Sequence, residues 1–289
     1  MKVLNEEFSI PTANGHALAV TKFYPQEPAI CTMVITSATG VLQKYYYKFA
    51  HWFATKGMVG YTFDYHGIGK SDSSEKTLKT INSDASSWGQ NDQAAIVAFA
   101  KNQNPGLKLV LVAHSIGGQL AGFNSNYQML DKVVLVASQT GYWNYFKGLH
   151  KLKMWLFWYV ILPLTTPIFG YFPAKKLGLF ENLPKKVVYE WAAWGRKPNY
   201  LMHFYDENSY VFDKFKIPIL ALSFSKDSFA PKEAVDWLAT QYNSADIKRV
   251  HHEAGLGEKH VKHFGFFKSW AEEPYWKRCL NYILNGNYE

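Results

Sequence analysis

The sequence predicts an α/β fold with a mostly parallel central sheet, helices on both faces of that sheet, and a helical cap inserted into the chain. Short, almost wholly apolar segments alternate with segments of helical periodicity, which is typical of parallel strands covered on both sides. This alternation stops for about seventy residues in the middle of the chain and then resumes. The 289 residues suffice for one large domain with an insertion. We therefore expect a core of residues 1–140 and 213–289, and a cap of residues 141–212.

The first part of the core alternates strands and helices in order. The helix expected at 44–56 places Tyr46, Phe49 and Phe53 on one face, and Gly57 is typical of its end. Residues 71–87 are polar and rich in Ser and Thr, so we expect a loop there. The remaining elements expected in this part are strands at 16–23, 31–36, 58–64, 109–113 and 132–137, and a helix at 88–101.

The second part begins with an aromatic segment in which no strand is expected. Between 141 and 212 the pattern indicates helices, around 155–162 and 184–195. Strand and helix then alternate again, with a proline in the first turn of one helix. The expected elements are strands at 217–224 and 246–251 and helices at 231–241 and 264–284.

Composition narrows the choice of partners and compartment. The net charge of +8 favours attraction to anionic surfaces, but the basic residues are scattered and form no nucleic-acid-binding motif. Cys31 and Cys279, the two cysteines, indicate neither a disulfide framework nor a metal site. The N-terminal segment lacks the apolar stretch of a signal peptide, so we expect a cytoplasmic protein. Nothing in the sequence indicates an oligomeric state.

A serine follows the apolar strand at 109–113. Ala113 and Gly117 lie two residues before and after Ser115, giving the pattern A-x-S-x-G between a strand and a helix. This arrangement is typical of a sharp turn that presents a nucleophilic serine hydroxyl at the carboxyl end of a sheet. The alternative is a strand–helix turn whose serine only caps the helix.

A nucleophilic serine needs a base, and the base needs a carboxylate to orient it. Asp227 follows the strand at 217–224, where an acid would be expected, although Asp is also common in simple turns. His263 lies in the loop after the last strand and is the expected base, with His260 as its rival. The order Ser115, Asp227, His263 therefore predicts a catalytic triad.

Backbone N–H groups are expected to stabilise the oxyanion that such a serine would create. One should belong to Ile116, the residue after the serine. The other should come from the turn after the strand at 31–36, at Gly40 or Val41, although Gly40 is also compatible with a simple loop. This chemistry requires no cofactor and no metal.

Several segments along the whole chain support a family resemblance. They are Ala38-Thr39-Gly40-Val41 with Tyr45-Tyr46, Phe63 to Ser71, Trp88-Gly89, His114 to Gln119, Gly141-Tyr142-Trp143, Gly170 to Pro173, Glu190-Trp191 and His263 to Phe267. With these segments the chain resembles the α/β-hydrolase superfamily. More narrowly, it resembles a bacterial group of predicted α/β-hydrolases near the serine-aminopeptidase-like and lysophospholipase-like branches.

The resemblance implies a role for each residue of the triad. It makes Ser115 the nucleophile, Asp227 the acid and His263 the base, and it implies no particular substrate. Two positions depart from the pattern of the group. His66 stands where an arginine is usual, and Lys262 stands where a glycine usually precedes the histidine.

The inserted segment contains an uncharged apolar run from Met154 to Ala174. In this superfamily such an insertion usually covers the active site, so its aromatic residues are candidates to line a substrate pocket. The run could instead pack the cap onto the core, dip into a membrane as a peripheral lid, or span a bilayer. Pro163 and Pro167 interrupt it, which disfavours a span. The candidate substrate contacts are Tyr142, Trp143, Trp155 and Trp158.

The sequence as a whole predicts a serine hydrolase that cleaves a small-molecule carboxylic ester through an acyl-enzyme. An apolar acyl or aromatic group would occupy the pocket under the cap. A thioesterase, a lysophospholipase or a small peptidase would use the same residues. A protein of a different class, a binding protein without turnover, would be expected to lack one member of the triad.

Overall fold

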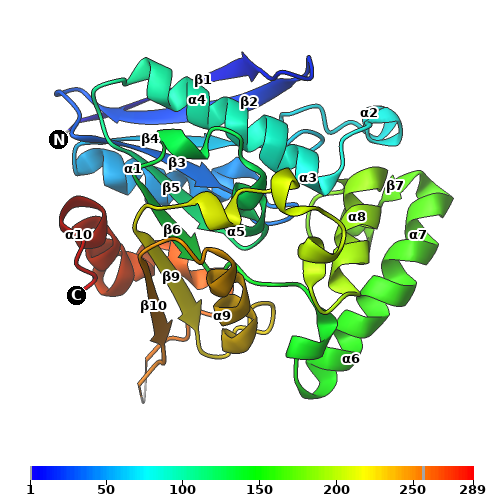
Figure 1. The fold of residues 1–289 in the computed structure, drawn as a ribbon. Coiled ribbons are helices and arrows are strands. Elements are labelled where there is room, and N and C mark those ends of the chain that lie inside the picture. Colours follow the sequence, from blue (N-terminus) through cyan, green and yellow to red (C-terminus); the bar gives the residue numbers. More distant parts are fainter. Residues whose placement is uncertain (1, 256–257) are drawn as a thin grey trace.

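In the computed structural model, which describes residues 2–255 and 258–289, an eight-stranded sheet forms the centre of the molecule (Figure 1). The strand order is β1-β2-β4-β3-β5-β6-β9-β10. The β1–β2 and β2–β4 pairs are antiparallel and the other neighbours are parallel, which confirms the predicted fold class. The strands are β1 Val3–Pro11, β2 Ala17–Pro25, β3 Cys31–Thr36, β4 Met58–Phe63, β5 Leu109–His114, β6 Lys132–Val136, β9 Ile219–Phe224 and β10 Ile247–His252.

Both faces of the sheet are covered, so every residue of β3, β4, β5 and β9 is buried. In β5, Leu111 and Ala113 point into one hydrophobic cluster, while Val110 and Val112 point into the other. The first cluster includes residues of α4 and α9, and the second includes residues of α1 and α10. This burial explains why the strands show no polar alternation. These helices and α5 are α1 Tyr47–Thr55, α4 Ala94–Gln103, α5 Ile116–Leu120, α9 Lys232–Gln241 and α10 Lys277–Asn285.

Residues 141–212 lie between β6 and β9 and fold mainly as helices, which Figure 1 shows grouped beside the sheet. A π-helical segment, Phe157–Ile161, joins α6 to α7. The expectation that this segment contains no strand was wrong, because β7 and β8 form a small antiparallel pair. Each strand has two residues, too few to leave a periodic pattern. The bounds are α6 Gly148–Leu156, α7 Leu162–Phe169, β7 Tyr171–Phe172, β8 Leu183–Pro184 and α8 Lys185–Gly195.

Three other segments differ from the sequence-based expectation. The first strand, β1, was not expected, because its polar run Asn5-Glu6-Glu7 lies at the edge of the sheet. The Asn14-Gly15 pair between β1 and β2 is typical of a hairpin and could have revealed it. The C-terminal helix is shorter than expected: 3₁₀ and π-helical turns occupy 265–276, and α10 begins only at Lys277.

The polar segment 71–87 is the third difference, because it contains two short helices instead of a continuous loop. The helices are α2, Glu75–Thr80, and α3, Ala85–Ser87. The side chains of Ser74 and Asp84 cap them by accepting the N–H group of the third residue of each helix. Polar composition therefore indicated a surface segment here, but it concealed the capping signals.

Candidate active site

Ser115 occupies a sharp turn between β5 and α5. Its backbone angles, φ 54° and ψ −118°, lie where a residue with a side chain is strained. The following helix passes so close to β3 that a Cβ on Gly117 would lie 2.4 Å from Thr36 Oγ1. The small residue after the serine is therefore required by the crossing of strand and helix, as the sequence pattern indicates.

The structure brings Ser115, Asp227 and His263 together from three separate loops. Ser115 Oγ lies 3.0 Å from His263 Nε2, and His263 Nδ1 lies 2.9 Å from Asp227 Oδ2. All three residues are buried. His260, the rival base, is not in this group, because its Nδ1 contacts Ser225 Oγ at 3.2 Å.

The carboxylate of Asp227 determines which nitrogen of His263 carries hydrogen. Asp227 Oδ1 accepts the backbone N–H groups of Phe229 at 2.8 Å and Ala230 at 2.9 Å. The same carboxylate has only Oδ2 left for the imidazole, and a carboxylate oxygen can only accept. His263 therefore donates from Nδ1, which leaves Nε2 free to accept the hydroxyl hydrogen of Ser115.

The turn after β3 supplies N–H groups at the same place, but not the one expected from Val41. The Val41 N–H already donates to the carbonyl of Ala38 at 3.0 Å, so this part of the prediction was wrong. Within the described residues, the N–H groups of Thr39, Gly40 and Ile116 donate to no protein acceptor. Thr39 and Gly40 line the same cavity as Ser115, so the turn can still contribute a donor there.

His114 and Tyr46 form a buried connection that the sequence analysis did not identify. His114 Nε2 donates to the carbonyl of His263 at 2.9 Å, and the Tyr46 hydroxyl lies 2.8 Å from His114 Nδ1. The same hydroxyl accepts the N–H of Ala38 at 2.9 Å. The His263 carbonyl can only accept, so His114 carries its hydrogen on Nε2. His114 Nδ1 then accepts, and the Tyr46 hydroxyl donates to it.

This connection ties together the three loops that carry the site. It joins the turn after β3, the residue before the serine, and the backbone of the histidine loop. Burial, together with the neighbouring His263, holds the pKa of His114 well below its usual range, so His114 stays neutral. The sequence signal was present, since a histidine directly before a buried serine must find partners, but the partners lie far away along the chain.

Lys262, one of the two departures from the family pattern, has a local consequence. Lys262 adopts φ 52°, a left-handed conformation that costs a lysine about 1–2 kcal/mol relative to the ordinary regions. Glycine adopts that conformation without strain, which explains why a glycine is usual before the histidine. The lysine nevertheless keeps the geometry of the loop, because His263 still reaches both of its partners.

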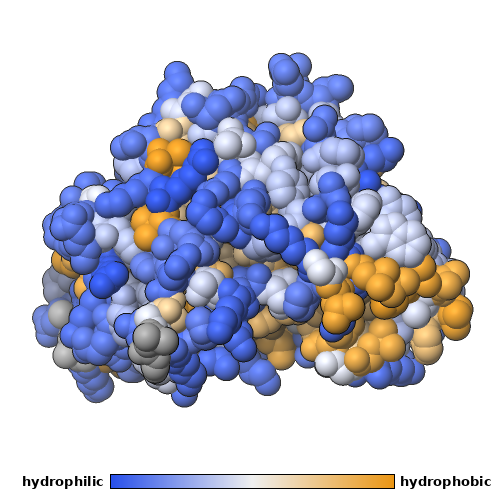
Figure 2. All heavy atoms as spheres, turned by 90° about the horizontal axis from the view of Figure 1, so that it is seen from below, coloured by the Kyte–Doolittle hydropathy of each residue, from blue (hydrophilic) through white to orange (hydrophobic). Residues whose placement is uncertain are grey.

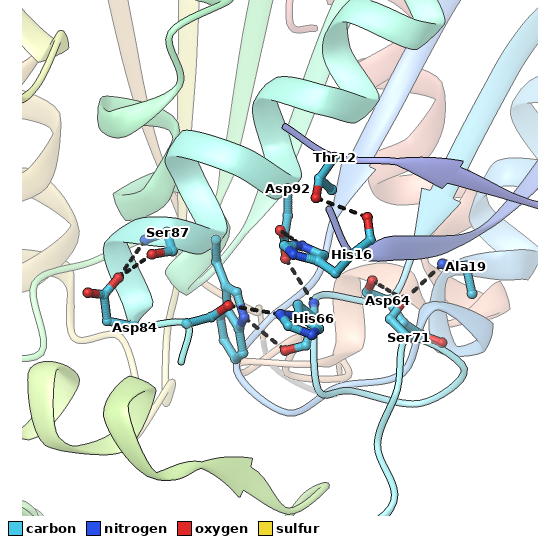
Figure 3. A network of polar contacts seen from close by, with 11 residues as sticks. Thr12, His16, Ala19, Asp64, His66, Ser71, Asp84, Ser87 and Asp92 are labelled. Carbon is cyan, nitrogen blue, oxygen red and sulfur yellow. Dashed lines mark hydrogen bonds and ion pairs between the residues drawn. The ribbon is translucent and has the colours of Figure 1, made fainter. Parts of the chain in front are cut away.

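The other departure, His66, lies in a polar cluster with His16 and Asp92 (Figure 3). Its ring stacks on that of His16 with centroids 3.8 Å apart, and its Nδ1 lies 2.8 Å from Ser83 Oγ. Asp92 holds both histidines, with Oδ1 2.8 Å from His16 Nε2 and Oδ2 accepting the backbone N–H of His66. Burial, and secondarily the charge of His16, lowers the pKa of His66 to about 4. The position is therefore neutral where an arginine would be charged.

A cavity of about 860 Å³ opens from Ser115 and His263 toward the inserted segment. Gly40 adjoins Phe180 at its edge, where a Cβ on the glycine would lie 2.5 Å from the ring. Of the four aromatic residues predicted to contact substrate, only Trp158 lines the cavity. Phe157, an aromatic residue of the run 154–174 that was expected to line a pocket, also lines the cavity. Further lining residues that the sequence analysis did not predict there are Phe146, Met154, Leu179, Phe180, Trp191, Phe229 and Phe264.

The other three aromatic candidates lie elsewhere, so their assignment was wrong. Trp155 is 37% exposed and stacks on Tyr159 at the surface. Tyr142 and Trp143 contact each other at an edge-to-face angle of 66° and do not line the cavity. Composition marked this segment as aromatic, but only the packing of α6 decides which rings face inward.

Comparisons with known proteins agree with this architecture. A carboxyl esterase from Bacillus coagulans has a TM-score of 0.70 at 14% identity, and the alignment covers 99% of each chain. DcsB, solved with a substrate analogue, has a TM-score of 0.66 at 14% identity, covering 97% of this chain and 99% of that one. An esterase from Pyrococcus furiosus has a TM-score of 0.62 at 14% identity, covering 99% of this chain and 92% of that one. At these identities the likeness shows the fold alone.

Sequence comparison adds the family. No curated protein sequence matches the chain. Residues 29–190, more than half of the chain, match the family described as serine aminopeptidase, S33. With the strand order and the turn at Ser115 already established, the chain belongs to this serine aminopeptidase family within the α/β-hydrolase superfamily.

Proposed function

We propose that the protein is a serine hydrolase that cleaves carboxylic esters through an acyl-enzyme intermediate. The observation that carries this proposal is the continuous contact from Asp227 through His263 to Ser115, at the floor of an apolar cavity. A serine hydroxyl is a weak nucleophile until a base accepts its proton, and here the base lies 3.0 Å away. Residues 141–212 act in this proposal as a cap over the cavity.

In the acylation step, Ser115 Oγ attacks the ester carbonyl carbon while its proton passes to His263 Nε2. Asp227 stabilises the imidazolium that forms and keeps its orientation. The negative charge moves to the carbonyl oxygen, where the N–H of Ile116 and an N–H of the Thr39–Gly40 turn can donate to it. When the C–O bond breaks, His263 returns the proton to the departing alkoxide, and an alcohol leaves.

Water reverses the sequence in the second step. His263 Nε2 takes a proton from water, and the resulting hydroxide attacks the acyl carbon. The tetrahedral intermediate collapses, the proton returns to Ser115 Oγ, and the carboxylic acid is released. The side chains of Asp227, His263 and Ser115 are therefore unchanged after one cycle, and the proposed reaction needs no other reactant than water.

The cavity favours an apolar acyl group over a free amino terminus. An aminopeptidase must bind the charged α-amine of its substrate, which normally requires an available carboxylate. Among the described residues that line the cavity outside the triad, Glu181 is the only carboxylate, and Lys175 already pairs with it. The many aromatic and aliphatic lining residues are suited to an acyl chain or an aromatic group.

The test compares wild-type protein with Ser115→Ala, using a fluorophosphonate probe and p-nitrophenyl esters of increasing acyl length. We expect wild-type protein to be labelled and to hydrolyse the esters, and both activities to disappear in the variant. Ser225→Ala removes a hydroxyl from a neighbouring loop, where it contacts His260, and serves as the matched control. A folded wild-type protein that is neither labelled nor active would refute the proposal. Faster cleavage of amino-acyl p-nitroanilides than of esters would assign a peptidase instead.

A further inference from the structure

The surface of the α6–α7 helices carries a row of apolar side chains that face solvent. Leu149 is 74% exposed, Leu164 61% and Ile168 77%. We call this row the α6–α7 face; it consists of Leu149, Leu152, Leu156, Ile161, Leu164 and Ile168. Figure 2 shows the hydrophobic colour gathered on this side of the molecule.

The spacing of these residues shows that they form one continuous stripe. Successive members are three or four positions apart, as expected for one side of an α-helix, except between Leu156 and Ile161. That interval of five coincides with the π-helical segment, whose wider turn takes up the additional residue. On the opposite side, Trp158, Leu162 and Thr166 are fully buried against the rest of the protein.

The chain segment that contains the α6–α7 face carries charge of one sign between residues 142 and 180. Residues 142–180 contain five lysines and neither Asp nor Glu. Lys147 pairs with Glu233, and Lys175 pairs with Glu181. The other three, Lys151, Lys153 and Lys176, have no carboxylate within ion-pair distance in the described part of the chain.

We propose that the α6–α7 face binds the surface of an anionic lipid bilayer. Apolar side chains in a row, accompanied by lysines without acidic partners, are the features of helices that lie in the plane of a membrane interface. Anionic headgroups would attract the lysines, and the exposed leucines and isoleucines would enter the boundary between headgroups and acyl chains. The helix is long and apolar enough to span a bilayer by composition, with 22 residues from Gly148 to Phe169. Its buried side, however, holds it against the protein.

This docking would place the cavity at the lipid surface. Lys153, Met154 and Phe157 belong to the same continuous helix as the α6–α7 face and line the cavity. Resting on the proposed esterase function, the inference assigns the substrate class: esters with a long acyl chain that partition into bilayers. Their acyl chain could pass from the membrane into the apolar cavity without crossing water.

A second copy of the chain is a poorer occupant of this face. A symmetric dimer would place each α6–α7 face against its own counterpart. The lysines that lack a carboxylate partner among the described residues would then oppose those of the other copy, which is unfavourable. An anionic lipid surface would instead bury the exposed apolar side chains and attract the lysines.

Vesicle sedimentation of the full-length protein tests the inference without requiring turnover. We expect the wild-type protein to pellet with vesicles of equimolar phosphatidylcholine and phosphatidylglycerol, and at least about tenfold less with phosphatidylcholine alone. Added NaCl should weaken the binding. The double variant Leu164→Glu, Ile168→Glu should bind the anionic vesicles at least about tenfold more weakly, since it removes two apolar anchors and adds two negative charges. Neither residue lines the cavity, so hydrolysis of soluble p-nitrophenyl butyrate should persist.

The matched control is the double variant Ile30→Glu, Leu284→Glu. These residues are also exposed, at 54% and 41%, and the substitution changes the net charge equally, but they lie in the core domain. Equal loss of binding in both double variants would overturn the inference, as would equal binding to neutral and anionic vesicles. A wild-type dimer in light scattering that Leu164→Glu, Ile168→Glu dissociates, without vesicle binding, would also overturn it.

Docking and hydrolysis can be separated. Ser115→Ala should pellet with anionic vesicles as the wild-type protein does, because Ser115 lies inside the cavity. If docking is observed but fluorophosphonate labelling is not, the esterase proposal fails and the docking surface stands. If labelling is observed but vesicle binding is not, the docking inference fails and the esterase proposal stands.

Discussion

The two walls of the cavity are held together by different forces. On the core side, Ser115, His263 and Asp227 are linked by directional hydrogen bonds, and His114 and Tyr46 extend the chain to the neighbouring turn. On the inserted side, aromatic packing dominates. Trp158 packs edge-to-face on Trp191 with centroids 4.7 Å apart and donates one hydrogen bond, to the carbonyl of Gly141.

The polar groups of the two walls differ in the same way. Each nitrogen of His114 and His263 has a partner, whereas Trp191 Nε1, on the inserted side of the cavity, has none among the described residues. Directional bonds fix atoms to within fractions of an ångström, while apolar contacts tolerate changes of shape. The core wall is therefore suited to chemistry, and the inserted wall is suited to adapting to substrates. The following predictions test that contrast.

Asp227→Asn should have the largest effect, because it removes the carboxylate that accepts the hydrogen bond of His263 Nδ1. Oδ1 accepts two backbone N–H groups, so the amide oxygen must take that position and the NH₂ must face His263. His263 would then hold hydrogen on Nε2 and could not accept from Ser115. We expect kcat to fall by about 10⁴-fold with little change in the melting temperature.

Steady-state kinetics on p-nitrophenyl butyrate would measure this loss. Asp236→Asn, on the surface of α9, removes a carboxylate whose one ion-pair partner among the described residues is Lys232, and it should retain full activity. A decrease smaller than tenfold in Asp227→Asn would contradict the assignment of the acid.

Trp158→Ala tests the inserted wall by removing its central ring. Trp158 is fully buried, and its loss should lower the free energy of unfolding by about 3–5 kcal/mol. Trp155→Ala removes a neighbouring ring that is 37% exposed, so we expect a change within about 0.5 kcal/mol. Urea unfolding of the two variants would measure the difference, and similar values would show that the inserted segment is not packed around Trp158.

Tyr46→Phe sharpens the comparison by removing one hydroxyl from the core network. The Ala38 N–H and His114 Nδ1 would both lose their partner in a buried place, which should cost about 1–3 kcal/mol of stability. A small displacement of the histidine loop should lower kcat by about tenfold and leave KM nearly unchanged.

The control for this variant is Tyr61→Phe, another buried tyrosine in the core. Its hydroxyl accepts one bond, from Asn104 Nδ2 at 3.1 Å, far from the serine along the sheet. Tyr61→Phe should lower the free energy of unfolding by about 1 kcal/mol and leave kcat unchanged. If both variants had equal kcat, Tyr46 would be structural and would not position the histidine loop.

The smallest effect concerns acid stability and lies outside both walls, at His66. Its pKa is lowered from 6.5 to about 4, so between these pH values His66 is protonated in the unfolded chain and neutral in the folded protein. Stability should therefore fall as pH decreases from about 6.5 toward 4. Between pH 7 and pH 4.5, the free energy of unfolding should fall by about 1 kcal/mol less in His66→Asn than in the wild-type protein, allowing for solvent screening.

Urea midpoints measured across this pH range would test the prediction. His252, whose pKa is also lowered to about 4 by burial, should contribute independently, so His66→Asn, His252→Asn should flatten the profile further. Parallel profiles for the wild-type protein and both variants would show that neither histidine resists protonation in the folded state.

The sequence by itself determined the features that depend on neighbouring residues. The apolar runs identified the parallel strands, and the small residues around Ser115 identified the turn. Both signals are local, because the burial of a strand and the close crossing of strand and helix each constrain only a few consecutive residues. The order of Ser115, Asp227 and His263 along the chain also predicted which side chains meet, since each follows a parallel strand and such strands end at the same edge of the sheet.

Only the tertiary structure decided which groups complete the site. The role of His114 depends on the backbone carbonyl of His263, 149 positions away along the chain. Whether Trp155 or Trp158 enters the cavity depends on the rotation of the continuous helix Gly148–Phe169, because both rings are equally apolar in composition. Contacts between residues distant in sequence leave no local pattern, so they become visible only when the chain is folded.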